Sequence, residues 1–338
     1  TCVVAYFLGR DLGGSSTGLL AAFFMAISEA FIGRTSLGFY DTENIGIFGM
    51  ITIAYLFLRS VDGERGLKER AVYGVLGGLA LGYTFASWGA TRYVVGLLVL
   101  FILVVLATGS FERRHLISYA SVLGVGYGIA LFVPKLGVKY LTSTENLVAI
   151  LLGFLIVAYE VARQKLDKRQ TTLLLGGLVL ALILSVFALD ALGVSTPIKG
   201  KFWRVLNPLQ SPSNPLSESV AEHKRSVWAS FFSSFGMTFP LAILGAYFSV
   251  NNLNDRRLYG VLLLVTAVYF MGSMTRLSLI LSIPVSLMAG YGLTELLAPF
   301  VALSRRKQST GRRRRKIVWH GVSKELSIVF TLFILVAL

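Results

Sequence analysis

Ten continuous apolar segments divide the sequence and restrict it to one class of fold. Each runs for about 15–22 residues, and about 20 apolar residues carry a helix across the hydrocarbon core of a bilayer. The segments are unbroken and longer than the ~10 alternating residues of a strand in a membrane barrel, so we expect helices. They cover residues 18–33, 44–58, 71–88, 93–109, 116–133, 147–162, 171–189, 228–249, 258–274 and 277–298.

Composition supports an all-α polytopic membrane protein. Hydrophobic residues make up 55% of the chain and charged residues 14%, whereas a soluble globular protein has about 25% charged residues. The apolar stretches Thr1–Gly9 and Leu326–Leu338 are too short to span a membrane. We therefore expect about ten complete and two partial helices, with residues 1–338 forming a transmembrane domain truncated at both ends. The glycines of one segment, Gly74, Gly77, Gly78 and Gly82, suit close contact between helices.

The basic residues predict the orientation of the chain. One set of alternate loops holds 22 of the 32 lysines and arginines and the other set holds ten, and the richer set faces the cytoplasm in most membrane proteins. That set includes the run Ser304–Lys316, which we expect to meet anionic headgroups, and the loops that contain His115 and His320. A nucleic-acid protein would instead gather its bases on one soluble face, so we expect no nucleic-acid partner despite the net charge of +15.

The external loops then cover residues 34–43, 89–92, 134–146 and 190–227 and the turn 275–276. The loop 190–227 has 38 residues and four of the eight prolines. A loop of this length in a compact protein is usually functional or disordered.

Asp41 and Glu43 form the first candidate site, in an external loop that also holds Arg34. Two carboxylates two residues apart can face one hard cation such as Mg²⁺ or Mn²⁺. The competing interpretation, which the spacing alone favours, is that both open the next helix, where negative charge suits the helix dipole.

Two further candidates lie in the other external loops. Glu222 and His223 could serve as a metal ligand, a general base or a hydrogen-bond acceptor, or they are solvated loop residues beside Lys224 and Arg225. Arg276 lies between two apolar helices, where its guanidinium suits a phosphate; the alternative is an arginine that reaches the membrane interface or pairs with a helix end.

The charge count places all of these candidates on one side of the membrane. Two or three carboxylates with arginines on one face suit a divalent cation that bridges a diphosphate. This arrangement favours a transferase with a phosphate leaving group over a channel.

At these residues the sequence resembles the catalytic subunit of oligosaccharyltransferase in its archaeal form, a glycosyltransferase of the GT-C type. The family has an arginine followed by a Gly-aromatic-Asp-x-Asp/Glu motif in its second external loop, as between Arg34 and Glu43. It also has a Ser-Val-Ser-Glu-His motif in its long fifth external loop, as in Ser219–His223 with Ala221 in place of the second serine. Trp88-Gly89 and Thr275-Arg276-Leu277 resemble two further family motifs.

The resemblance implies metal-dependent protein N-glycosylation, with transfer of an oligosaccharide from a dolichyl phosphate or diphosphate to the asparagine of Asn-x-Ser/Thr. Asp41 and Glu43 would bind Mn²⁺ or Mg²⁺, with His223 as a further candidate ligand. Glu222 would hold the acceptor amide, and Arg276 and Arg34 would contact the carrier phosphates. The active site would lie on the external face of an archaeal cell membrane.

Two elements of the family are missing from residues 1–338: a metal-binding aspartate of the first external loop and the soluble C-terminal domain that recognises the acceptor. We therefore expect these residues alone to be inactive. The alternatives are another glycosyltransferase that uses lipid-linked sugars, such as a protein O-mannosyltransferase, and a multipass transporter. A transporter would carry its ionisable residues at the middle of the membrane, whereas the charges here cluster at loop borders.

Overall fold

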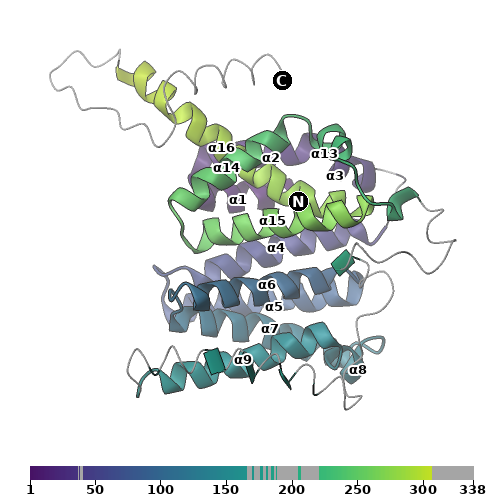
Figure 1. Cartoon of the computed structure of the whole chain (residues 1–338), viewed down its shortest axis with the longest axis vertical. Helices are drawn as coiled ribbons and strands as arrows, with labels where there is room; N and C mark the ends of the chain where they lie inside the picture. Colours follow the sequence, from purple (N-terminus) through teal and green to yellow (C-terminus); the bar gives the residue numbers. More distant parts are fainter. Residues whose placement is uncertain are drawn as a thin grey trace. The chain divides into compact units, whose positions relative to one another are not determined.

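The computed structural model describes residues 1–36, 38, 41–165 and 221–306, together with isolated positions between 170 and 206. The chain divides into two compact units, which we call the terminal unit (residues 1–36 and 214–338) and the central unit (residues 37–213). The described residues of both units form helices joined by turns (Figure 1). The expected segment 171–189 and most of the loop 190–227 and of the run Ser304–Lys316 lie outside the described residues.

In the terminal unit the long helix α16 packs against several other helices (Figure 1). Of the 18-residue apolar window within Thr275–Pro299, 83% is buried, so this stretch forms the core of the unit. Gly245 of α14 and Gly292 of α16 permit a close approach, because a Cβ on Gly245 would lie 2.0 Å from the carbonyl oxygen of Met288. The elements are α1 (Cys2–Gly13), α2 (Ser15–Ile27), α3 (Glu29–Thr35), η1 (Ala221–His223), α13 (Trp228–Phe235), α14 (Thr238–Asn251), α15 (Asp255–Ser273), η2 (Thr275–Leu277) and α16 (Ser278–Arg306).

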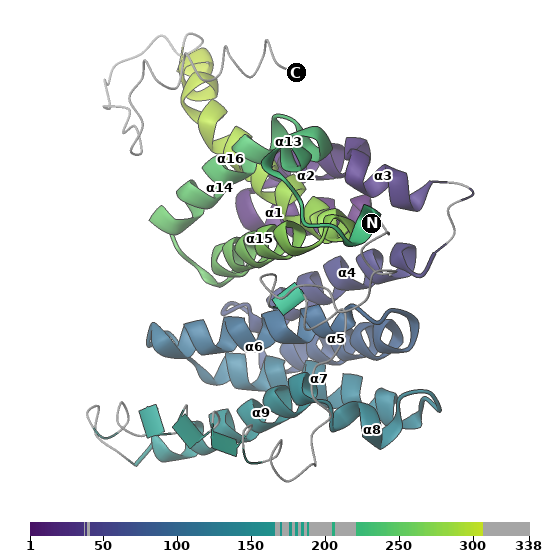
Figure 2. The same ribbon diagram turned by 45° about the vertical axis from the view of Figure 1, so that its right-hand side comes forward.

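In the central unit α5 packs between α4 and α7 (Figure 2). Gly74, Gly78 and Gly82 of α5 face α7, where added Cβ atoms would lie within 2.5–2.7 Å of side-chain atoms. The expectation that these glycines serve close helix contact is confirmed. The elements are α4 (Glu43–Val61), α5 (Leu67–Ser87), α6 (Thr91–Ala107), α7 (Arg113–Phe132), α8 (Gly137–Leu141) and α9 (Thr144–Ala162).

Two of the predicted segments are broken helices. The segment 18–33 contains α2 and α3, which bend by 57°, and the segment 228–249 contains α13 and α14, which bend by 96°. Gly236 ends α13 with a φ of 50°, a conformation that costs glycine little and other residues more. Four of the described helices are long and apolar enough to cross a membrane, or up to six if each bent pair is one span. The chain is thus an all-α multipass membrane protein.

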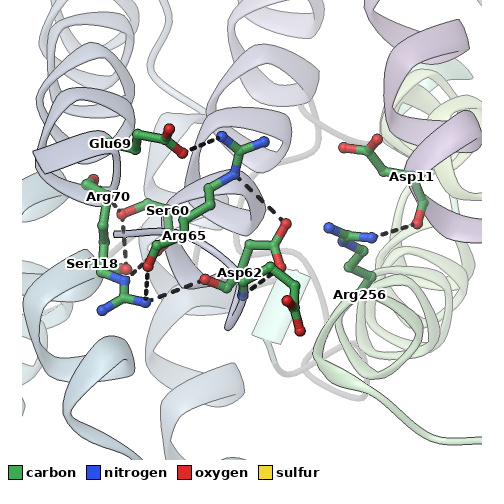
Figure 3. Close-up of polar contacts among 9 residues, drawn as sticks. Asp11, Ser60, Asp62, Arg65, Glu69, Arg70, Ser118 and Arg256 are labelled. Atoms are coloured by element: carbon green, nitrogen blue, oxygen red, sulfur yellow. Dashed lines mark hydrogen bonds and ion pairs between the residues drawn. The ribbon is translucent and has the colours of Figure 1, made fainter. Parts of the chain in front are cut away.

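Polar contacts join helices within each unit. In the central unit Arg70 donates from Nε to the carbonyl oxygen of Ser60 at 3.0 Å, and Ser60 donates to Ser118 at 2.8 Å (Figure 3). In the terminal unit Arg256 donates to the carbonyl oxygen of Asp11 at 3.0 Å (Figure 3). Within each unit, these contacts join segments that the charge count had assigned to one side of the membrane.

One loop expectation is wrong. His115 lies in the first turn of α7 and is fully buried, where its Nδ1 accepts a hydrogen bond from the backbone N–H of Glu112 at 2.9 Å. The ring satisfies a backbone N–H at the start of the helix, which has no intrahelical partner.

Candidate functional site

Three of the predicted site residues meet in the terminal unit. Arg34 Nη2 lies 2.5 Å from Glu222 Oε1, and Arg276 Nη1 lies 3.8 Å from Glu222 Oε2. The three side chains come from α3, η1 and η2 respectively. We call them the Glu222 cluster.

The Glu222 cluster combines one carboxylate with two guanidinium groups, so its formal charge is positive. The Glu222 side chain is 41% exposed and that of Arg276 is 37% exposed, so both remain open to a ligand. Partly exposed ion pairs contribute little to stability. The cluster therefore suits recognition of a group that brings its own negative charge, such as a phosphate.

Two short segments place Glu222 beside Arg276. The backbone N–H of Thr275 donates to the carbonyl oxygen of Lys224 at 3.0 Å, and the hydroxyl of Ser226 donates to the carbonyl oxygen of Met271 at 2.7 Å. The chain on the C-terminal side of Glu222 is thus hydrogen-bonded to the chain on the N-terminal side of Arg276. The sequence motifs marked both charged residues but gave no sign of Ser226.

Asp41 and Glu43 lie in the central unit, at the start of α4. Asp41 Oδ1 accepts hydrogen bonds from the backbone N–H of Thr42 at 2.6 Å and from its hydroxyl at 3.1 Å. Thr42 occupies the N-cap position, so Asp41 does not cap the helix. Glu43 does lie in the first turn, where the helix dipole stabilises a carboxylate, and it is 5% exposed.

Asp41 and Glu43 are the type of ligand that a hard cation binds, but two side chains are fewer than such a site needs. Asp41 and Glu43 offer carboxylate oxygens within one turn of chain, the ligand type that Mg²⁺ and Mn²⁺ prefer. Among the residues that the structure describes, no group of three or more His, Cys, Asp or Glu side chains could hold a metal ion. His223 lies in η1 of the other unit, and its Nδ1 is buried without a hydrogen-bond partner among the described residues.

Trp88 has a packing contact with the start of α4. Its side chain is 8% exposed, and a Cβ added to Gly46 would lie 2.2 Å from the indole Cδ2. The carbonyl oxygen of Trp88 also accepts a hydrogen bond from the hydroxyl of Thr91 at 2.6 Å. Trp88 thus packs one helical turn after Glu43 and restricts the position of this part of α4.

Solved structures show the same fold. The archaeal oligosaccharyltransferase AglB from Archaeoglobus fulgidus, in complex with an inhibitory peptide and a dolichol-phosphate, has a TM-score of 0.74 at 17% identity. The match covers 99% of this chain and 42% of that one. The apo form of the Archaeoglobus fulgidus oligosaccharyltransferase has a TM-score of 0.75 with the same coverage.

Curated relatives are similar in sequence. The dolichyl-diphosphooligosaccharide–protein glycosyltransferase subunit stt-3 of Caenorhabditis elegans is 31% identical over 301 residues, which is 86% of this chain and 39% of the relative. Subunit STT3B of Oryza sativa subsp. japonica is 29% identical over 320 residues, which is 92% of this chain and 44% of the relative. The chain therefore spans less than half the length of these relatives.

A family model connects these similarities. Residues 1–289 match the model described as oligosaccharyl transferase STT3, N-terminal, so the match includes every candidate site residue from Arg34 to Arg276. The chain belongs to the STT3 oligosaccharyl transferase family.

Proposed function

We propose that this chain forms the membrane-embedded catalytic part of an oligosaccharyltransferase. The enzyme would transfer an oligosaccharide from a dolichyl phosphate or diphosphate carrier to the side-chain amide of asparagine in Asn-x-Ser/Thr. Membership of the STT3 family and the glycosyltransferase relatives support this activity. The observation that carries it is the Glu222 cluster, which holds a carboxylate between two arginines.

Each member of the Glu222 cluster would have a separate task. Glu222 would accept a hydrogen bond from the acceptor amide and take up its proton while the nitrogen bonds to the anomeric carbon of the sugar. The bond between that carbon and the phosphate oxygen breaks, and the carrier leaves as its phosphate or diphosphate. Arg276 would pair with this phosphate. Arg34 lies closer to Glu222 than Arg276 lies to Glu222. Arg34 would therefore mainly pair with Glu222 and contact the phosphate from the edge of the cluster.

Asp41 and Glu43 would bind the divalent cation. Mn²⁺ or Mg²⁺ would neutralise negative charge on the leaving phosphate. Two carboxylates would leave the remaining ligand positions to other donors. We expect the whole site to face the exterior of an archaeal cell membrane.

Glu222→Gln tests the proposal in the natural polypeptide that carries these residues. The substitution keeps the shape of the side chain and removes its negative charge, and we expect glycan transfer to an Asn-x-Thr peptide to fall by about 10²-fold or more. Glu64→Gln is the control, because Glu64 is exposed in the 62–66 turn of the central unit. Unchanged transfer by Glu222→Gln, or transfer to a peptide in which glutamine replaces the acceptor asparagine, would contradict the proposed chemistry.

A further inference from the structure

We propose that a short backbone junction sets the position of Glu222 relative to Arg276, and that Ser226 is the positioning residue within it. We call this junction the clasp: residues 224–226 on one side and residues 271–275 on the other. The inference rests on the proposed function. The distance between Glu222 and Arg276 matters for the reaction only if Glu222 binds the acceptor and Arg276 binds the carrier.

The clasp is made of hydrogen bonds from both sides. The backbone N–H of Ser226 donates to the carbonyl oxygen of Gly272 at 3.3 Å, and its hydroxyl donates to that of Met271 at 2.7 Å. In the other direction, the backbone N–H and the hydroxyl of Thr275 both donate to the carbonyl oxygen of Lys224, at 3.0 and 3.1 Å. The hydroxyl of Ser226 also lies 3.3 Å from that of Thr275.

These hydrogen bonds lie close in sequence to Glu222 and Arg276. Thr275 directly precedes Arg276, and Lys224 is two residues after Glu222. Ser226 bonds to two carbonyl groups at the end of α15: that of Gly272, and that of Met271, which also accepts from the backbone N–H of Met274 at 3.2 Å. A serine at this place therefore ties the segment that carries Glu222 to the end of the helix that leads into Arg276.

The two ion pairs of Glu222 hold its side chain rather than its backbone. Glu222 belongs to a helix of three residues, and its ion pair with Arg276 is long, at 3.8 Å, and partly exposed. The pair with Arg34 joins Glu222 to a different element, α3. The clasp, by contrast, links the backbones on which Glu222 and Arg276 themselves stand. Because a misplacement of about 1 Å in a reacting geometry can cost about 10²-fold in rate, the clasp should act on turnover.

The test compares Ser226→Ala, Ser226→Thr and Ser233→Ala in the natural polypeptide that carries these residues. Ser226→Ala removes the hydroxyl, Ser226→Thr keeps it, and Ser233→Ala removes an exposed hydroxyl of α13 that bonds to the carbonyl oxygen of Ser230. We expect Ser226→Ala to lower kcat by about tenfold or more, with the KM for the acceptor peptide and the Tm nearly unchanged. Ser226→Thr should recover most of kcat, and Ser233→Ala should behave as the wild type.

Glu222→Gln, measured in the same preparation, separates the two ways in which the inference can fail. Full activity of Glu222→Gln overturns the proposed function and the clasp with it. An inactive Glu222→Gln together with a fully active Ser226→Ala overturns the clasp alone. A loss of kcat in Ser226→Ala that is matched by a fall in Tm, is shared by Ser233→Ala or is not recovered in Ser226→Thr also overturns it, since Ser226 would then serve only the stability of the fold.

Discussion

The side chain of Arg34 ends 2.5 Å from Glu222, and this contact gives it a role that can be tested apart from phosphate binding. A charge-assisted hydrogen bond of this kind orients the carboxylate. If Arg34 steadies Glu222, Arg34→Ala should lower kcat by about tenfold, which corresponds to about 1.4 kcal/mol in the activation free energy. Steady-state kinetics with the acceptor peptide and the lipid-linked donor varied in turn would measure it.

The control for Arg34→Ala is Arg113→Ala, because Arg113 is exposed at the start of α7 in the central unit. The alternative role makes a different prediction. An arginine that binds mainly the carrier phosphate would, when replaced by alanine, raise the KM for the donor and leave kcat nearly unchanged. That result would remove Arg34 from the support of Glu222.

A second residue-scale prediction concerns Gly46, which packs against Trp88. A Cβ at Gly46 would lie 2.2 Å from the indole ring, so Gly46→Ala overpacks a buried contact and should destabilise the protein by about 1–3 kcal/mol. Thermal unfolding in detergent measures the loss. Gly96→Ala is the matched control, because an added Cβ at Gly96 of α6 meets no atom within 4 Å. Equal melting temperatures for the two variants would show that α4 and Trp88 separate without cost.

The sequence singled out the charged residues of the Glu222 cluster as candidates but did not predict which of them are in contact. Arg34, Glu222 and Arg276 stood out because charged groups at membrane boundaries need a partner or a ligand. The pairing of Arg34 with Glu222 could not be predicted, because it joins residues 188 positions apart through the packing of several helices. Ser226 could not be recognised either, since a lone serine near a helix resembles any other loop serine.

At the scale of elements, apolar runs predicted where helices lie and missed where they bend. The run 228–249 is continuous in hydrophobicity, and hydrophobicity does not record a change of direction. Gly236 and Pro240 were the available signals: the glycine adopts a φ of 50° at the end of α13, and the proline lies in the first turn of α14, where its missing N–H has no intrahelical partner to lose. The bend at Ser28 has neither a glycine nor a proline beside it. In the structure it is visible as the extended backbone of Ser28 between α2 and α3.

The bend between α13 and α14 changes the direction in which α13 runs relative to the membrane. If α14 crosses the bilayer, a helix bent from it by 96° lies along the surface. Trp228 and Phe232 are 71% and 56% exposed and lie one turn apart, whereas Phe231 and Phe235 are buried. We expect the exposed pair to contact lipid at the level where tryptophan is enriched, near the headgroups.

Quenching of tryptophan fluorescence by brominated lipids measures this depth. Lipids brominated near the headgroup should quench the wild type more than Trp228→Phe, and lipids brominated near the chain end should quench the two proteins equally. Phe232→Tyr is a suitable control, since it leaves Trp228 in place and keeps an amphipathic ring beside it. If Trp228→Phe does not change quenching at any depth, α13 does not rest on the lipid surface.

At the scale of the whole molecule, the count of basic residues assigned each loop to one side of the membrane. The contacts within each unit join segments that this count had assigned to the same side. In the terminal unit the loops of Arg34, Glu222 and Arg276 meet. In the central unit Arg92 pairs with Glu145 at 2.7 Å, which joins two other loops of the same predicted side. The agreement has a physical origin, because each helix that crosses the bilayer reverses the side of the next loop.

Labelling with a thiol reagent that cannot cross membranes would test which side is external. In a Cys2→Ser background, which removes the only cysteine of the chain, Lys139→Cys should react in intact cells and Lys68→Cys only after the cells are opened. Both positions are exposed and both lie in the central unit, so accessibility within the protein does not separate them. The excess of lysine and arginine near Lys68 should hold that loop in the cytoplasm. Reaction of Lys68→Cys in intact cells, with Lys139→Cys protected, would reverse the orientation and place the Glu222 cluster on the side opposite to an external glycosylation site.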